Sequence, residues 1–193
     1  VYGIRIKGGA PGALIKNNLF ADLETGVVVG DAKFSGLNGN AFAYVSKCFV
    51  IGSISNSTIS NNTASGWKLS TGAAAFGAFC HIGSSQDLVM TGNSVHWELD
   101  ARCKTRTVDE QPNGRAFVNV ENSKNLMLAN NVFHTVQSQT VVRLHNVTGS
   151  AVTDNIVTFG KGGNAVAQTG ECSGNYYRPI DPENSAPFDS YKQ

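Results

Sequence analysis

Apolar and polar positions recur along the chain around a set of regularly placed asparagines. Each of these asparagines follows an apolar residue by three positions and precedes an apolar or small residue by two; they are Asn18, Asn40, Asn62, Asn93, Asn131, Asn155 and Asn175. Successive members are 22, 22, 31, 38, 24 and 20 residues apart. A repeat near 22 residues with occasional insertions is typical of a solenoid, in which each repeat makes one turn and stacks on the turn before it.

Upstream of several asparagines, apolar residues alternate with variable ones. The apolar pairs, thirteen and eleven positions before the asparagine, are Phe49/Ile51, Cys80/Ile82, Val118/Val120 and Val142/Leu144. This period of two is typical of a strand with one buried face. Apolar residues three before and two after the asparagine indicate two more short strands in each repeat. No run has the apolar spacing of a helix, so the sequence predicts an all-β fold.

The asparagines themselves are predicted to hold sharp corners between strands. An asparagine tolerates left-handed backbone angles at a corner and can hydrogen-bond nearby backbone groups. Stacked asparagines can also hydrogen-bond one another up a column. We therefore interpret the seven residues as structural.

Together these patterns predict a parallel β-solenoid of roughly eight turns, each rising about 4.8 Å, the spacing of paired strands. We expect it to occupy residues 1–177 and to be part of a longer polypeptide, because no polar cap precedes Ile4. Prolines in residues 178–193 break strand pairing, so this tail is predicted to be a cap or linker.

Composition excludes several classes of function. Lys+Arg number 15 against Asp+Glu 14, and this near-neutral balance argues against a nucleic-acid-binding protein, which would carry a basic stripe. No apolar run is long enough to cross a bilayer, so no membrane insertion is expected. The cysteines form no CxxC pair, and Cys80 and Cys172 occupy inward positions of the repeat. We expect no metal or other cofactor.

Candidate catalytic residues come from one charge-dense segment. Eight of the chain's 29 charged residues lie between positions 98 and 115, within the longest insertion. From Val95 onward apolar and polar residues alternate, which places Glu98 and Asp100 on one strand face about 5 to 8 Å apart, in the range of catalytic carboxylate pairs of glycosidases. The candidate catalytic acids are Glu98, Asp100, Asp109 and Glu110. A solvated charged strand face is the alternative interpretation.

Candidate substrate-binding residues surround these acids or share their repeat positions: His96, Arg102, His134, Arg143, Trp67 and Arg115. His96 and His134 each follow their asparagine by three positions, so their imidazoles are predicted to stack on adjacent turns. Trp67 could offer a ring face to a sugar. Arg143 continues a column of outward positions that runs from apolar to polar: Val28, Val50, His81, Asn119 and Arg143. Exposed Val28 and Val50 favour cover by a preceding segment or by trimer mates.

The paired asparagines in Ile59-Ser60-Asn61-Asn62 and Leu128-Ala129-Asn130-Asn131 resemble those of the pectate-lyase-like superfamily. The resemblance covers roughly residues 4 to 177 and implies a right-handed parallel β-helix, with the bacteriophage tailspike proteins as the most similar group. Arg5-Ile6-Lys7 also resembles a polygalacturonase element, but the aspartates and Gly-His-Gly element that precede it in that family are missing, so catalysis of that type is not expected here.

The resemblance implies a homotrimeric tailspike-like protein on a virion surface that binds and depolymerises a bacterial surface polysaccharide, as a glycosidase or a lyase. Two alternatives stay open. One is a non-catalytic shaft or glycan-binding segment of a virion fibre. The other is a fragment of a bacterial pectinase-type lyase or hydrolase.

Overall fold

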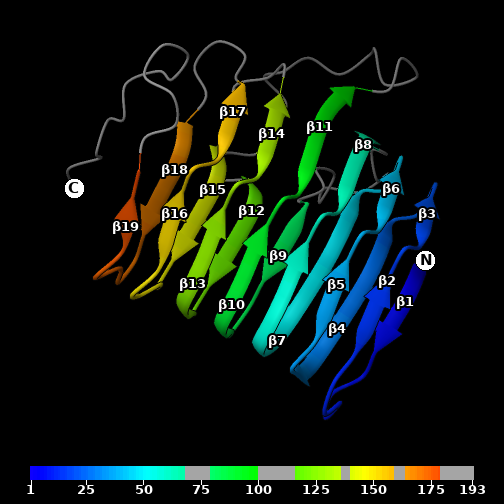
Figure 1. Ribbon diagram of the computed structural model, residues 1–193, viewed down its shortest axis with the longest axis horizontal. Helices are drawn as coiled ribbons and strands as arrows, with labels where there is room; N and C mark the ends of the chain where they lie inside the picture. The colour runs from blue at the N-terminus through cyan, green and yellow to red at the C-terminus, as the bar shows by residue number, and fades with distance from the viewer. Residues whose placement is uncertain (68–78, 100–115, 136–139, 159–163, 179–193) are drawn as a thin grey trace.

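The computed structural model describes residues 1–67, 79–99, 116–135, 140–158 and 164–178 (Figure 1). Every regular element within these ranges is a β-strand, and they contain no helix. The predicted all-β class is therefore confirmed. The same residues include no helix that is long and apolar enough to span a membrane.

The strands form two sheets. The larger, 13-stranded sheet contains β1 (Tyr2–Ile6), β2 (Leu14–Lys16), β4 (Thr25–Lys33), β5 (Gly36–Asn38), β7 (Lys47–Ser60), β9 (Cys80–Ile82), β10 (Gln86–Thr91), β12 (Ala116–Glu121), β13 (Lys124–Ala129), β15 (Thr140–His145), β16 (Ala151–Thr153), β18 (Asn164–Thr169) and β19 (Tyr176–Tyr177). The 6-stranded sheet contains β3 (Leu19–Ala21), β6 (Ala41–Ala43), β8 (Thr63–Trp67), β11 (Ser94–Leu99), β14 (Val132–Thr135) and β17 (Ile156–Thr158).

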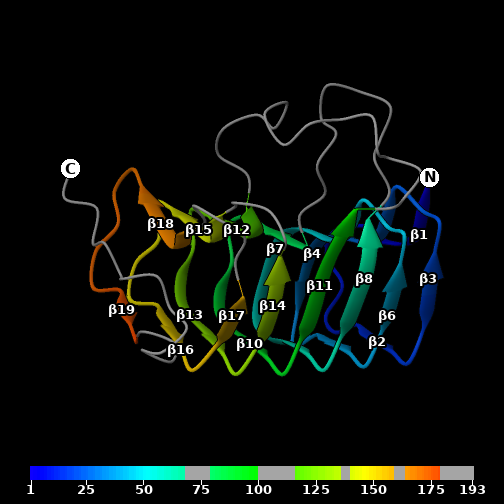
Figure 2. The same ribbon diagram turned by 90° about the horizontal axis from the view of Figure 1, so that it is seen from above.

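All pairings between these strands are parallel and join positions one repeat apart. In the larger sheet Val28 pairs with Val50 and Val50 with His81, while Asn119 pairs with His81 and Arg143. The smaller sheet has the order β17-β14-β11-β8-β6-β3, which follows the sequence in reverse. Repeats therefore succeed one another along the long axis of the molecule (Figures 1 and 2), an arrangement compatible with a β-helix-like solenoid.

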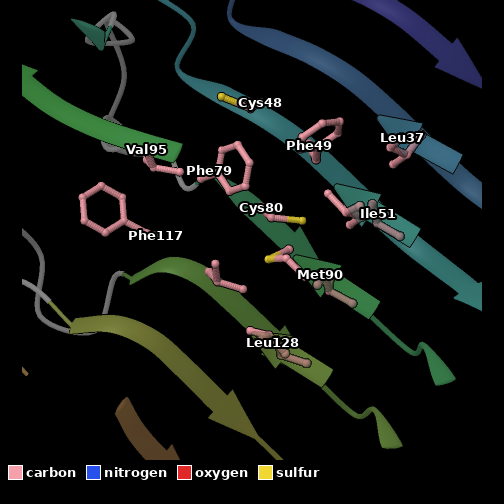
Figure 3. Packing of buried hydrophobic residues seen from close by; sticks show 14 of the residues in the cluster. Leu37, Cys48, Phe49, Ile51, Phe79, Cys80, Met90, Val95, Phe117 and Leu128 are labelled. Atoms are coloured by element: carbon pink, nitrogen blue, oxygen red, sulfur yellow. The ribbon is translucent and has the colours of Figure 1, made fainter. Parts of the chain in front are cut away.

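The core lies between the two sheets. Phe42 of β6 contacts Phe49 of β7 edge-on with ring centroids 4.8 Å apart, and Phe117 of β12 stacks on Phe133 of β14 at 6.1 Å. The predicted apolar pairs from Phe49/Ile51 to Val142/Leu144 are buried, whereas Cys172, also predicted to be inward, is half-buried. Figure 3 shows the labelled apolar side chains from several strands packed in this interior. The buried Cys80 thiol belongs to the same cluster, as its position in the repeat predicts.

The asparagines form a hydrogen-bonded ladder along the turn between the two sheets. Each Oδ1 accepts both the backbone N–H and the side-chain Nδ2 of the ladder asparagine one repeat earlier; for Asn93 the donors are Asn62 N at 3.0 Å and Asn62 Nδ2 at 2.9 Å. The ladder runs through Asn18, Asn40, Asn62, Asn93, Asn131 and Asn155. Amide-to-amide bonding up a column is thus confirmed for six of the seven residues.

Two details of that prediction are wrong. Asn175 does not extend the ladder, because Tyr177 pairs with Val152 and Asn175 Oδ1 accepts the backbone N–H of Ser150, in a neighbouring column. The ladder asparagines also have ordinary backbone angles. The left-handed position is the residue just before each of them: Asn17, Gly39, Asn61, Gly92, Asn130 and Asp154. The ladder residue is therefore selected by its side-chain hydrogen bonds.

The two long insertions predicted from the spacing fall between β8 and β9 and between β11 and β12. Strand β11 ends at Leu99, so the alternation predicted from Val95 onward lies outside the described residues beyond this point. At the other end of the chain, Arg178 N–H still donates to Val152 O at 3.1 Å, and residues 179–193 are outside the described part.

Candidate functional site

Three of the four predicted catalytic acids lie outside the described residues. Asp100, Asp109 and Glu110 lie outside the described residues, as do Arg102 and Arg115. Glu98 belongs to β11 and Trp67 to β8, and the structure describes the backbone at both positions. Leu99 pairs with Trp67 across these two strands. The catalytic assignments therefore stay predictions.

The predicted histidine pair does form, on the smaller sheet. His96 of β11 pairs in register with His134 of β14, and their ring centroids are 5.7 Å apart with an interplanar angle of 35°. His96 is exposed and its Nε2 lies 3.1 Å from Ser94 Oγ. Stacking on adjacent turns was predicted from their common repeat position, and it is confirmed.

Arg143 belongs to the other sheet and lies within a second group of polar side chains. We define the polar row as His81 of β9, Asn119 and Glu121 of β12, and Arg143 and His145 of β15. Asn119 pairs with His81 and Arg143, and Glu121 pairs with His145, so the five residues occupy two adjacent columns. All five are half-buried. The structure therefore separates Arg143 from His96 and His134, with which the sequence grouped it.

Hydrogen bonds within the polar row fix the orientation of Asn119. Its Nδ2 donates to Glu121 Oε1 at 2.9 Å and lies 2.9 Å from His81 Nδ1. A carboxylate only accepts, so the NH2 end of the amide must face Glu121. His81 Nδ1 faces the same NH2 group, so it is the acceptor in this contact.

The carbonyl end of the same amide has no partner. Within the part of the chain that the structure describes, Asn119 Oδ1 is buried and accepts no hydrogen bond. An unsatisfied buried polar atom costs about 1–3 kcal/mol, so such groups are rare unless a ligand or function requires them. Asn119 is thus a candidate ligand-binding group as well as a positioning one.

Glycines explain why the polar row begins only part-way along the sheet. The positions equivalent to Glu121 in earlier repeats are Gly30, Gly52 and Gly83. A Cβ at Gly52 would lie 2.6 Å from Gly30 O, so consecutive backbones approach too closely there for side chains. From β12 onward this column carries Glu121 and His145, the latter 3.0 Å from Thr169 Oγ1.

Glu121 and His145 were not among the residues predicted from sequence. The signal that could have found them is the change from glycine to polar residues at one repeat position, two after Asn119 and two after Arg143. Chemically, the polar row combines a carboxylate, two imidazoles, an amide and a guanidinium. Such groups bind hydroxyls and carboxylates and can exchange protons near neutral pH. No three His, Cys, Asp or Glu side chains among the described residues are arranged to hold a metal ion.

Comparisons with known proteins add no name to this site. The sequence matches no protein-family model and no curated protein.

Proposed function

We propose that this chain is part of a right-handed parallel β-helix of a tailspike-like protein, and that the polar row binds and cleaves a bacterial surface polysaccharide. The protein is then a homotrimer acting outside the bacterial cell, on a virion surface. The observation that carries the proposal is the polar row itself, above all the Glu121 carboxylate that Asn119 Nδ2 holds in place beside His81.

The architecture supports the β-helix part of the proposal. Every described strand pairing is parallel, and one hydrogen-bonded asparagine column runs through six repeats. Parallel repeats stacked at about 4.8 Å present the same outward position again and again along one axis. Such a surface suits a long polymer lying across several repeats.

The chemistry of the polar row supports a carbohydrate ligand. Sugar hydroxyls both donate and accept hydrogen bonds, and the row offers an acceptor at Glu121 and a cation at Arg143. Asn119 Nδ2 donates to one oxygen of Glu121, and among the described residues no group bonds to the other oxygen, which can then meet a substrate hydroxyl or glycosidic oxygen. Glu121 then acts as a general acid or base.

Glycoside hydrolysis through two carboxylates requires a second acid. In this proposal it is one of the predicted candidates outside the described residues, Asp100, Asp109 or Glu110, because Glu98 belongs to β11 of the smaller sheet. A lyase instead needs a base and a group that neutralises the substrate carboxylate, which Glu121 or a histidine and Arg143 could supply.

The test is depolymerisation of a panel of capsular and O-antigen polysaccharides by the wild-type chain and its variants. Release of reducing ends reports cleavage, and ultraviolet absorbance of unsaturated ends distinguishes a lyase. We expect Glu121→Gln to slow cleavage about 100-fold, the usual contribution of a general acid or base. The exposed Glu171→Gln, which removes the same charge outside the polar row, should leave the rate unchanged.

Glu98→Gln and Asp100→Asn extend the assay to the predicted acids. Unchanged cleavage in both removes them as catalytic residues. The function proposed for the polar row is wrong if the wild-type chain neither binds nor cleaves any polysaccharide of the panel, or if Glu121→Gln and Asn119→Ala both retain full binding and rate.

A non-catalytic shaft of a virion fibre is the second candidate, favoured by an exposed apolar column. Leu14, Met127 and Tyr176 are 64%, 46% and 57% exposed and share one outward position of the repeat. Packing of this column against symmetry mates would bury it. Light scattering after size exclusion should give a trimer whose assembly is weakened by Met127→Asp; a trimer without any cleavage favours the shaft.

A further inference from the structure

Two histidines on the smaller sheet, His96 and His134, have no part in the function proposed for the polar row. Strands β11 and β14 run side by side in this sheet (Figure 1), and the two residues pair in register. His96 is exposed and His134 is half-buried. The chain's other histidines, His81 and His145, belong to the larger sheet. The pair is therefore a separate cluster of metal-ligating side chains.

Each ring of the pair has a nitrogen that can reach a ligand. His96 Nε2 lies 3.1 Å from Ser94 Oγ, two residues earlier on the same strand. When Nε2–H donates to this hydroxyl, the lone pair of His96 Nδ1 is free, and an outer partner of this kind is what usually orients a metal-binding histidine. Within the described part of the chain, neither ring nitrogen of His134 forms a hydrogen bond.

The separation of the two rings suits a shared metal ion. Zn²⁺ binds an imidazole nitrogen at about 2.0–2.1 Å, so the ion lies about 3.2 Å from each ring centre, and a tetrahedral angle then sets the two ring centres about 5.2 Å apart. The ring centroids of His96 and His134 are 5.7 Å apart, with an interplanar angle of 35°. A movement of about 0.5 Å, which a small side-chain rotation supplies, brings one nitrogen of each ring onto the same ion.

The charges around the pair do not oppose a cation. The six described strands of the smaller sheet contain no lysine or arginine, and their one charged residue is Glu98, two positions after His96. The polar row differs in this respect, because the guanidinium of Arg143 lies on the same strand as His145. A metal ion is therefore expected at His96 and His134 in preference to the histidines of the larger sheet.

We infer that His96 and His134 form a binding site for a divalent transition-metal ion, which takes one nitrogen from each ring and completes its coordination with water. Imidazole is a ligand for Zn²⁺, Cu²⁺ and Ni²⁺, whereas Ca²⁺ and Mg²⁺ prefer oxygen. The ion links two adjacent turns of the smaller sheet. Sequence spacing could not reveal this site, because its two ligands belong to different repeats and only strand pairing brings them together.

The test is calorimetric titration of the full, metal-free chain with Zn²⁺ at about pH 7.5, where imidazole is neutral. We expect one ion to bind per chain, and nitrogen-15 spectra should show shifts of the ring nitrogens of His96 and His134 but not of His81 and His145. His96→Gln and His134→Gln should each weaken zinc binding at least about tenfold, because each removes one of the two protein ligands. Mg²⁺ should leave the ring signals unchanged.

His145→Gln is the matched control, because it removes one imidazole from the larger sheet and should leave the zinc affinity unchanged. Glu121→Gln should also leave it unchanged, which separates this inference from the function proposed for the polar row. Equal melting temperatures without metal show that the variants fold. The inference is overturned if the wild-type chain binds no Zn²⁺, if the shifted signals are those of His81 and His145, or if either His96→Gln or His134→Gln binds zinc as tightly as the wild type.

Discussion

Removing one amide from the middle of the asparagine ladder should destabilise the protein far more than removing one from its end. Asn93 is fully buried, and its Nδ2 donates to Asn131 Oδ1 at 2.8 Å and to Ile59 O at 3.0 Å. Its Oδ1 accepts the backbone N–H of Asn62. Asn93→Ala therefore leaves a buried backbone N–H without a partner and breaks several side-chain hydrogen bonds.

The size of the effect follows from these contacts. An orphaned buried N–H costs about 1–3 kcal/mol, and each further hydrogen bond lost costs about 1 kcal/mol, which gives about 3 kcal/mol in total. That is a large part of the 5–15 kcal/mol that typically stabilises a domain. For a chain of this length the melting temperature should fall by roughly 6–12 °C.

Asn18→Ala is the matched control at the first ladder position. Asn18 is half-buried, and its Nδ2 donates to Asn40 Oδ1 and Lys16 O while its backbone N–H keeps Asn40 as acceptor. No backbone N–H loses its partner, so the loss should be about 1 kcal/mol or less. Urea unfolding at 25 °C measures both variants. Equal losses of unfolding free energy would refute the idea that the inner ladder satisfies backbone groups which nothing else can reach.

Three further expectations concern strain, close packing and ionisation. Phe34→Asn should raise the unfolding free energy by about 1 kcal/mol in the same urea assay by relieving the left-handed strain at its φ of 52°; a loss would show that the ring packs. Gly52→Ala should cost about 2 kcal/mol, because the new Cβ would lie 2.6 Å from Gly30 O; an unchanged melting temperature would contradict this close approach. Burial raises the pKa of the Cys48 and Cys80 thiols, so both should resist alkylation by iodoacetamide at pH 8 in the folded chain. As the pH rises, these thiols lose their protons in the unfolded state before they do so in the folded state. The unfolding free energy should therefore be unaffected by the thiols below about pH 8.5 and should fall as the pH rises further. An unfolding free energy that stays constant from pH 8 to 10 would contradict buried thiols.

The sequence was a good guide to the fold because the repeat is visible in side-chain chemistry. Ladder asparagines and alternating core residues such as Phe49 and Ile51 recur once per repeat, and parallel strand pairing places residues one repeat apart side by side. Asn175 was misassigned because its Oδ1 accepts a backbone N–H, that of Ser150, as a ladder asparagine does, but at a different turn. Spacing along the sequence cannot separate two polar turn positions. The left-handed residue was displaced by one because asparagine suits both roles.

The candidate site was less predictable. His96 and His134 were found because they share a repeat position on strands that pair. Glu121 was missed because its importance depends on Asn119, whose amide bridges it to His81 and leaves one oxygen orphaned. A network of that kind depends on side-chain rotamers across two strands. Periodicity reports which face a residue occupies, but it does not report which neighbour it bonds.

The central claim is that repeats stack in parallel and in register, so distances along one column must grow with the number of repeats. Spin labels at Leu14, Met127 and Tyr176 test this claim, because all three sites are exposed and share a column. The labelled chain has Cys103 and Cys172 replaced by serine and is diluted with unlabelled protein. Electron–electron resonance should give backbone separations of about 19 Å from Leu14 to Met127, four strand spacings, and about 29 Å from Leu14 to Tyr176, six spacings. A Leu14–Tyr176 distance equal to or shorter than the Leu14–Met127 distance would contradict the stacked arrangement.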